Sequence, residues 1–472
     1  MAGIRDFAEY IPLESDLFDI VIIDEASQVS IAQAFPALLR GKKIIVLGDK
    51  KQFSNVKSSQ ARSDTNREYL NHLRDIFLDT ISTEATKIER LGKFNIKTSI
   101  LEFFERINNF NIMLKKHFRG YREIISYSSK HFYDDSLQAI KIRVKPIEQV
   151  IKFSFINHDG RIETVENSNR LEIEAIVTEV ERIANDKPIS SIGILTPHTN
   201  QQKLLVEAFS KHPEYEHFTK SHKLKIMTFD TCQGEERDII LYSMVANPVS
   251  DKLWGIFIKD AKSVDLEEGG QIKLQRLNVG FSRAKERMHF FLSKPIEEFT
   301  GSIGEALVYY QRTLKDAQKL PDAKDTDPKS PMENKVLNWL QDTNFFKSNR
   351  SNIELHAQFP LGEYIKQLDK HYTHPFYVVD FLLVFTDPSG KQHKIIIEYD
   401  GFEYHFQDHA AINKFSYGEY YTEQHVYREK VLESYGYNFV RINRFNVGTD
   451  PIVMLDKRLE DTVKKKTINA TR

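Results

Sequence analysis

The sequence predicts an α/β protein in which doubly wound layers are followed by a further α/β domain. Between residues 17 and about 295, short apolar strands alternate with helical stretches. The strands are rich in Ile, Val and Leu with little polar alternation, as is typical of parallel strands covered by helices on both faces. Polar residues follow several strands directly, where open α/β sheets place their ligands. A new pattern of one helix and long strands begins after about residue 330.

The elements of the first region follow from these apolar runs. We expect strands at 17–24, 43–49, 191–196, 224–229, 238–245 and 287–293. Residues 55–97 are polar and helix-like, which predicts an inserted helical element. A helix is expected at 303–318, and the Pro-, Asp- and Lys-containing linker after it marks a domain boundary near 320–330.

Bulk composition excludes several classes of protein. Hydrophobic residues make up 40% and charged residues 28% of the chain, as in ordinary globular proteins. No apolar run reaches the roughly 18 residues that span a bilayer, and the N-terminal residues do not resemble a secretory signal. The single cysteine, Cys232, excludes an internal disulfide framework. We therefore expect a cytoplasmic protein without a membrane partner; the net charge of −1 leaves nucleic-acid binding open, because binding follows local patches.

Two strand ends carry polar groups suited to nucleotide chemistry. Asp24 and Glu25 end the first strand, and Asp49 and Gln52 follow the next one. A bare Asp–Glu pair is more often an ordinary strand end. Two such ends in this order favour a site in which Asp24 binds Mg²⁺, Glu25 activates water and Gln52 senses the terminal phosphate.

These motifs resemble superfamily 1 helicases of the nonsense-mediated-decay type. DEASQ (24–28) and GDKKQ (48–52) carry the resemblance, which continues through 100–137 (motif IV), 192–202, 226–241 (motif V) and 274–292 (motif VI). It implies an incomplete first RecA-like lobe over 1–116, a complete second RecA-like lobe over 117–298, and a helix and linker over 299–330. It also implies that this region binds ATP, and that Gln201 or Gln202 lies near a nucleic-acid path. The implied nucleotide-binding residues of the second lobe are Arg119, Gln233, Gly234, Glu235 and Arg283.

The phosphate-binding loop of this family is absent from the 472 residues. No G-x-x-x-x-G-K-[ST] occurs, so nothing in the chain would cradle the β- and γ-phosphates. In the family this loop lies far upstream of DEAS, whereas 23 residues precede Asp24 here. We expect a split gene or a truncated protein, negligible ATPase activity of this chain alone, and ATP as a cofactor only if an upstream partner supplies the loop.

The C-terminal region, 331–460, presents a second set of carboxylates. Ser330 and Glu333 fit a capping box at a helix start, with Pro331 in the first turn. Of the two apolar strands expected at 376–385 and 394–402, the first contains Asp380. The second places Glu398 and Asp400 on one face, because strand side chains alternate. Carboxylates in apolar strands are costly unless they are paired or bind metal, which favours a Mg²⁺ or Mn²⁺ site.

This helix–strand–strand arrangement resembles the PD-(D/E)XK nuclease fold, a restriction-endonuclease-like fold, in its very-short-patch-repair-like branch. The match covers 331–447 and implies that Asp380 and Glu398 are metal ligands and Glu333 the acid of the first helix. Asp400 stands where the wider fold often has lysine. His405 or Lys430 could replace that lysine, and His405 could equally be structural. Arg428 and Arg441 would contact DNA phosphate, brace the site or pair at the surface.

The leading hypothesis is a helicase–nuclease polypeptide, or its downstream part, that cleaves DNA through the C-terminal domain. It would bind single-stranded DNA or a duplex with a single-stranded region, and RNA stays possible. The alternative is a catalytically silent nucleic-acid-binding or regulatory subunit completed by a partner. Defence against foreign DNA is an expectation by analogy with helicase–nuclease fusions.

Overall fold

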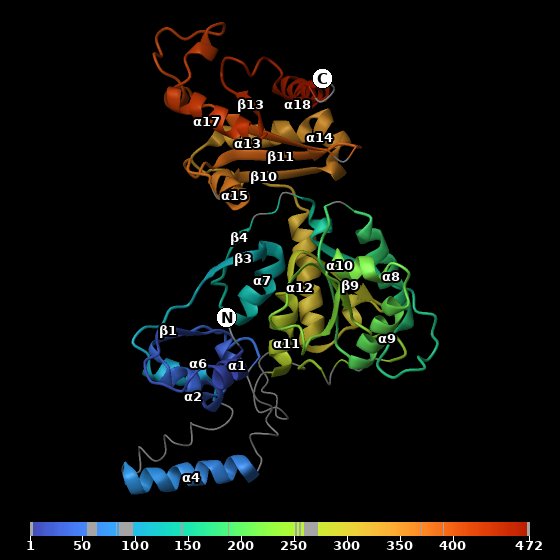
Figure 1. Cartoon of the computed structure of the whole chain (residues 1–472). Coiled ribbons are helices and arrows are strands. Elements are labelled where there is room, and N and C mark those ends of the chain that lie inside the picture. Colours follow the sequence, from blue (N-terminus) through green and yellow to red (C-terminus); the bar gives the residue numbers. More distant parts are fainter. Residues whose placement is uncertain are drawn as a thin grey trace. The chain divides into compact units, whose positions relative to one another are not determined.

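The computed structural model describes residues 3–53, 64–81, 83–84, 98–141, 143, 145–186, 188–250, 253, 256–258, 272–369, 371–389 and 391–469. The chain divides into two compact units. Unit 1 comprises Met1–Lys116, Glu123–Gln138 and Lys152–Gln311. Unit 2 comprises His117–Arg122, Ala139–Ile151 and Arg312–Arg472. Each is described by itself, with the elements labelled as in Figure 1.

Unit 1 begins with a small α/β layer built on two parallel strands. Its elements are α1 (Ile4–Tyr10), β1 (Phe18–Ile23), α2 (Ile31–Leu39), β2 (Gly41–Val46), α4 (Asp64–Thr80) and α6 (Ile100–Ile107). β1 and β2 pair from Phe18↔Gly41 to Ile23↔Val46. The starts of α2 and α6 are fixed by capping boxes, Ser30 with Gln33 and Ser99 with Glu102. Of the predicted insertion at 55–97, α4 is described, and most of the rest lies outside the described residues.

The larger part of unit 1 is a five-stranded sheet in the order β5-β9-β8-β6-β7. Its strands are β5 (Ile151–Phe155), β6 (Ile192–Thr196), β7 (Lys225–Thr228), β8 (Arg237–Ser243) and β9 (Ala284–Leu292). The neighbours β6–β7, β6–β8 and β8–β9 run parallel, as predicted. Its helices are α8 (Arg170–Ala184), α9 (Thr199–Ser210), α10 (Tyr215–Lys220), α11 (Ile272–Phe281) and α12 (Gly301–Ala317). β3 (Lys116–Tyr121), α7 (Arg122–Phe132) and β4 (Gln138–Lys141) precede this sheet in the chain.

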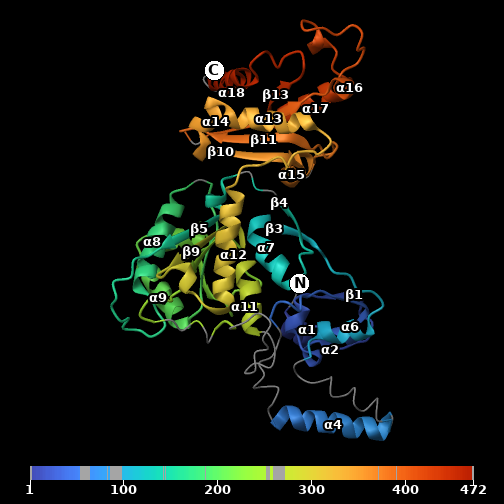
Figure 2. The ribbon, with the colours of Figure 1, turned by 180° about the vertical axis from the view of Figure 1, so that it is seen from behind.

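Helices cover both faces of this sheet. α8 and α9 lie on one side of the strands, and α11 and α12 lie on the other (Figures 1 and 2). Apolar residues of α8 and α9 pack with Ile192, Ile194 and Leu241. On the opposite face, Tyr242 stacks on Phe290, and Phe281 packs edge-on against both of these rings and against Tyr310. The predicted doubly wound arrangement is thus present.

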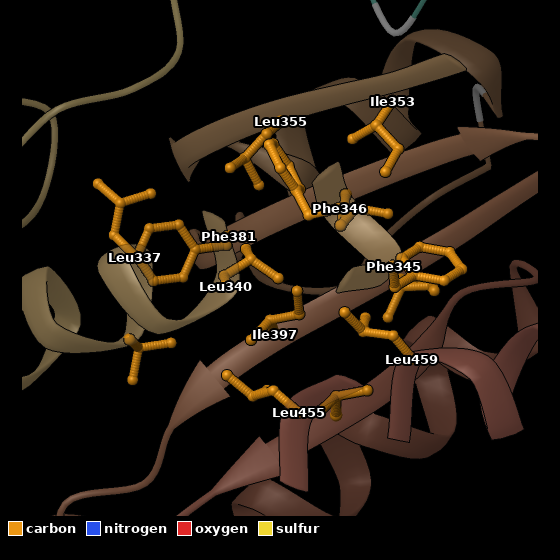
Figure 3. Packing of buried hydrophobic residues seen from close by; sticks show 14 of the residues in the cluster. Leu337, Leu340, Phe345, Phe346, Ile353, Leu355, Phe381, Ile397, Leu455 and Leu459 are labelled. Carbon is orange, nitrogen blue, oxygen red and sulfur yellow. The ribbon is translucent and has the colours of Figure 1, made fainter. Parts of the chain in front are cut away.

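Unit 2 contains a four-stranded sheet in the order β10-β11-β12-β13. The strands are β10 (Ile353–Phe359), β11 (Val379–Thr386), β12 (Gln392–Tyr399) and β13 (Asn438–Ile442), and only β12 and β13 pair in parallel. The helices are α13 (Pro331–Asp342), α14 (Asn344–Ser348), α15 (Leu361–Leu368), α16 (Phe402–His405), α17 (Glu423–Ser434) and α18 (Pro451–Asn469). Figure 3 shows Phe381 and Ile397 of the sheet packed with Leu337, Leu340 and Leu459. A second cluster on the other face joins Leu382 and Ile396 to Leu432 of α17.

In the described part of the chain, no helix combines the length and the apolar character needed to cross a membrane.

Candidate functional sites

The first candidate site lies where β1 and β2 end. The two strands are parallel and in register up to Ile23↔Val46, so Asp24 and Asp49 leave the sheet at the same edge. The backbone pairing continues one step further, because Ala26 N donates to Leu47 O at 2.9 Å. The prediction that these two strand ends share an edge is confirmed. Glu25 adopts a left-handed backbone conformation with φ of 51° at the turn.

Three of the residues predicted for nucleotide binding meet in hydrogen bonds at this edge. Gln233, from the loop after β7, donates from Nε2 to Glu25 Oε2 at 3.2 Å. Gln52 donates from Nε2 to Asp49 Oδ2 at 3.1 Å. Tyr133, which the sequence analysis did not identify, donates its hydroxyl hydrogen to the same Asp49 oxygen at 2.5 Å. Burial and the negative charge of Asp49 raise the pKa of Tyr133, so the phenol stays protonated.

Arg283 and Glu235 are held by partners within the protein. Arg283 lies in the predicted loop between α11 and β9, yet it is only 2% exposed. Its guanidinium donates to Val279 O at 2.7 Å and to Glu235 O at 3.3 Å. The Glu235 carboxylate accepts from Lys225 at 2.7 Å and from Arg237 at 2.9 Å, and these bonds hold its pKa below the ordinary value. Gly234, with φ of 77°, supplies the left-handed turn between Gln233 and Glu235.

Arg119 belongs to the other unit, and the two glutamines of α9 bond within unit 1. Arg119 is half-buried in β3, in the segment that belongs to unit 2. Gln201 is fully buried, accepts from Asn169 N at 2.8 Å and donates to Ser243 Oγ at 2.9 Å. The amide of Gln201 therefore braces the core, which leaves Gln202 as the alternative for a residue near a nucleic-acid path. Gln202 donates to Ile226 O at 3.0 Å.

The second candidate site is an acidic cluster in unit 2. The antiparallel register of β11 and β12 runs as far as Phe381↔Ile397, so Asp380 and Glu398 are the next residues beyond this last pair. Asp380 Oδ2 accepts from Tyr399 N at 2.9 Å. Burial, the charge of Glu398 and the charge of Glu333 raise the pKa of Asp380 to about 8, an effect only partly offset by the Tyr399 hydrogen bond and by Arg428.

Two arginines brace the deeper carboxylates. Glu398, 3% exposed, accepts from Arg428 Nη2 at 2.5 Å and lies 3.4 Å from Arg441 Nη1. Arg441 Nη1 also donates to Asp400 Oδ1 at 2.7 Å, so one guanidinium contacts both acids. This shared contact places Glu398 and Asp400 on one side of the strand, as predicted. Burial raises the pKa of both carboxyl groups, while the arginines lower it.

The Asp400 carboxylate, unlike that of Asp380, is paired with an arginine and accepts a hydrogen bond from a tyrosine hydroxyl. Asp400 is 1% exposed, and in addition to Arg441 its carboxylate accepts from the Tyr421 hydroxyl at 2.8 Å. Tyr421 in turn accepts from Asn443 Nδ2 at 3.0 Å. Arg428 and Arg441 therefore brace the acids, and neither is a surface pair.

Of the two candidates for the role of the missing lysine, only His405 lies at the cluster. His405 Nε2 is 3.8 Å from Asp400 Oδ1, and its ring centroid is 4.3 Å from that of His425. His425, which the sequence analysis missed, has its pKa lowered to about 4 by burial and by His405. Lys430 is exposed on α17 and makes no ion pair with the described residues.

Glu333 lies at the start of α13 but does not form the predicted capping box. Ser330 makes no side-chain hydrogen bond to the helix, so that prediction is wrong, although Pro331 does occupy the first turn. The Glu333 carboxylate instead accepts from Asp327 N at 3.1 Å and from Gln358 Nε2 at 2.7 Å. Glu333 is 6% exposed. These bonds turn its carboxylate toward the sheet and away from its own helix end.

The fit of a divalent cation rests on Asp380 and Glu398. Among the described residues, no group of three or more His, Cys, Asp and Glu side chains is arranged to hold a metal ion. Mg²⁺ is usually bound through one or two carboxylates together with waters and substrate phosphates. Asp380, whose pKa is raised by burial and then by the charge of Glu398, and Glu398, whose two oxygens accept from Arg428, are the carboxylates that would serve as ligands here.

Comparisons with known proteins match unit 1. Two family models, each described as an AAA domain, match residues 5–60 and 96–293. The uncharacterized ATP-dependent helicase MG140 of Mycoplasma genitalium is 28% identical over 311 residues, 63% of this chain and 25% of that protein. The DNA replication ATP-dependent helicase/nuclease DNA2 of Saccharomyces cerevisiae is 26% identical over 294 residues, 59% of this chain and 17% of that protein. The chain thus spans a quarter or less of these relatives.

Among solved structures, the helicase nsp10 of PRRSV aligns with 57% of this chain and 35% of its own. Its sequence identity is 12% and the TM-score 0.17, which is too low to support an argument about the fold.

Proposed function

We propose that the nucleic-acid-acting protein to which residues 5–60 and 96–293 belong is a superfamily 1 helicase that cleaves DNA with unit 2. The match of these residues to AAA domains, and the likeness to relatives named as ATP-dependent helicases, support the helicase part of this proposal. In this proposal Asp380 and Glu398 hold Mg²⁺ or Mn²⁺, and the motor domains bind the nucleic acid. The observation that carries it is that these two acids directly follow Phe381 and Ile397, the last pair of the β11–β12 register, and interact electrostatically.

The charge balance of the cluster supports this assignment. Two arginines compensate Glu398 and Asp400, but Asp380 keeps a pKa raised to about 8 in the metal-free protein. Burial makes the ionised form of such a carboxyl group unfavourable, and a bound cation would stabilise this form. A bound divalent ion would activate water and stabilise the leaving oxygen of a phosphodiester.

The residues around the metal ligands have separate tasks in this proposal. Arg428 and Arg441 hold Glu398 in place from α17 and β13. Asp400 keeps Arg441 oriented, and His405 is the group near the cluster that can transfer a proton at its Nε2 atom. Glu333 adds negative charge at the start of α13.

Cleavage of supercoiled plasmid with Mg²⁺ or Mn²⁺ tests the proposal. Asp380→Asn and Glu398→Gln keep the side-chain shape and remove one ionisable carboxyl group each. We expect either change to lower the rate of nicking by at least about 100-fold, because it removes a metal ligand. Asp387→Asn, at a half-buried turn acid of the same unit that pairs with His393, is the matched control and should cleave like the unaltered protein.

The outcomes separate the alternatives. Wild-type nicking that survives both Asn and Gln changes would refute the assignment of the site. A wild-type protein that binds DNA but shows no metal-dependent cleavage would identify a silent binding subunit. Competition between single-stranded DNA and RNA of equal length then decides the substrate class.

A second proposal, that another segment or protein completes the first lobe, rests on a specific surface. Parallel sheets are ordinarily buried on both faces. In the two-stranded β1–β2 sheet, Val21, Ile23, Ile44 and Val46 pack into the core. The alternate residues Ile20, Ile22, Ile45 and Leu47 are 52%, 61%, 43% and 43% exposed. A further α/β segment carrying the phosphate-binding loop would cover this face and place the loop near Asp24.

A further inference from the structure

Gln358 has a backbone conformation that is costly for its residue type. It lies inside β10 with φ of 47°, in the left-handed region. Non-glycine residues are strained in this region and persist there only where the surroundings enforce the conformation. Such outliers are frequent at functional sites. The contacts of the Gln358 side chain therefore show whether it takes part in one.

The conformation changes which way the strand faces. Ala357 packs with the cluster of α13 and α18, whereas Phe359 belongs to the cluster on the other face. Residues two apart in a regular strand share a face, so the reversal occurs at Gln358. A glycine would make this backbone turn at lower cost. The backbone alone therefore does not account for a glutamine at this position.

The side chain of Gln358 joins the acidic cluster. The pairs Ala357↔Phe381 and Phe359↔Val379 flank it, which places Gln358 opposite Asp380 on the neighbouring strand. Its Nε2 atom donates to Glu333 Oε2 at 2.7 Å. Gln358 thus links the acid of α13 to the strand that carries Asp380.

We propose that Gln358 is a positioning residue that holds the Glu333 carboxylate at the metal site formed by Asp380 and Glu398. This inference rests on the proposed function of unit 2. The side-chain amide of Gln358 suits this role because it donates a hydrogen bond to Glu333 without adding charge to a site that already contains three carboxyl groups. Residues that orient metal-site groups in this way typically change metal affinity or activity by about 10- to 100-fold when they are replaced.

The test compares Gln358→Gly with Gln358→Ala in the full chain. Both remove the hydrogen bond to Glu333, and only glycine tolerates the left-handed conformation. We expect metal-dependent nicking to fall by about 10-fold or more in both variants. The metal-free Tm of Gln358→Gly should exceed that of Gln358→Ala by about 2 to 4 °C. The increase in Tm on adding Mn²⁺ without DNA should be reduced in both.

Asp408→Gly is the matched control, because Asp408 is exposed, has φ of 52° and lies in the same unit. It should leave nicking and the Mn²⁺-induced Tm increase unchanged. If Gln358→Gly nicks DNA and responds to Mn²⁺ like the unaltered protein, the positioning role is refuted. Equal Tm values of the Gly and Ala variants would refute the conformational argument. If Asp380→Asn also leaves the Mn²⁺ response and the nicking unchanged, the metal site itself has been wrongly assigned.

Discussion

At the level of single residues, the carboxyl group of Asp380 determines how unit 2 responds to pH. Its ordinary pKa of 3.8 is raised to about 8 by burial, by Glu398 and by Glu333. Between these two pH values the folded protein retains a proton that the unfolded chain has lost. Stability therefore falls as the pH rises from about 4 to about 8.

Replacing Asp380 by Asn should remove this contribution to the pH dependence of stability. Asparagine cannot ionise, and its side-chain oxygen can still accept from Tyr399 N. In EDTA, we expect the Tm of Asp380→Asn to exceed that of the unaltered protein by a margin that grows from pH 4 to pH 8 and then stays constant. Thermal unfolding across this pH range measures it.

Asp387→Asn provides the opposite case. Hydrogen bonds from Ser389 and His393 hold the pKa of Asp387 below its ordinary value, so its contribution is present at neutral pH and lost in acid. This variant should lower the Tm at pH 7 and converge with the unaltered protein at low pH. A Tm difference for Asp380→Asn that does not change with pH would contradict the raised pKa.

Some residues of the acidic cluster in unit 2 can be predicted from the sequence, and others cannot. Asp380 and Glu398 stand out because each interrupts an apolar strand, and their face follows from strand alternation. Gln358 and His425 carry no such signal, since their partners come from other elements. Glu333 illustrates an ambiguity, because an S-x-x-E pattern fits a capping box, yet the side chain bonds to Gln358 instead.

At the level of elements, the segment that leads into β11 depends on a close approach to α15. Gly362 N donates to Tyr377 O at 2.9 Å. A Cβ atom on Gly362 would lie 2.5 Å from Phe376 Cα and from Tyr377 N. These are backbone atoms, so a side chain at 362 can be accommodated only if the segment moves. The adjacent Val378 O accepts from Arg428, which holds Glu398.

Gly362→Ala should therefore destabilise unit 2 and disturb the site together. We expect a loss of roughly 1–3 kcal/mol from overpacking, seen as a lower urea midpoint, and slower plasmid nicking. Gly418→Ala is the matched control in the same unit, because nothing lies within 4 Å of its added Cβ. Unchanged urea midpoints in both variants would show that the 375–378 segment adapts freely.

The accuracy of the predicted elements depended on the composition of each strand. Runs of Ile, Val and Leu located β1, β2, β6, β8, β9, β11 and β12 to within a few residues. β10, with the sequence IELHAQF, was missed because its apolar residues alternate with polar ones at the edge of the sheet. β5 was missed as well. Whether such a segment forms an edge strand depends on its pairing with residues distant in the sequence, which the local pattern does not show.

At the level of the whole molecule, the edge of β1 and β2 and the acidic cluster of unit 2 differ in what they contain. The edge of β1 and β2 brings Glu25 and Gln233 together, and Arg283 stays bonded to Val279 O. The 472 residues include no G-x-x-x-x-G-K-[ST] loop for the phosphates. The acidic cluster of unit 2, in contrast, has both of its proposed metal ligands within one sheet. We therefore expect the two activities to be separable.

The chain of these 472 residues should bind single-stranded DNA without hydrolysing ATP. Phosphate release with ATP, Mg²⁺ and single-stranded DNA should not exceed that of a Glu25→Gln variant, because the phosphates lack the loop that would orient them. DNA nicking by the same preparation should persist without ATP. Turnover of ATP that Glu25→Gln abolishes would contradict this, since it would show that the edge of β1 and β2 supports hydrolysis without the loop. Loss of nicking in the absence of ATP would instead show that unit 2 depends on the motor, against the separation argued from the contents of each site.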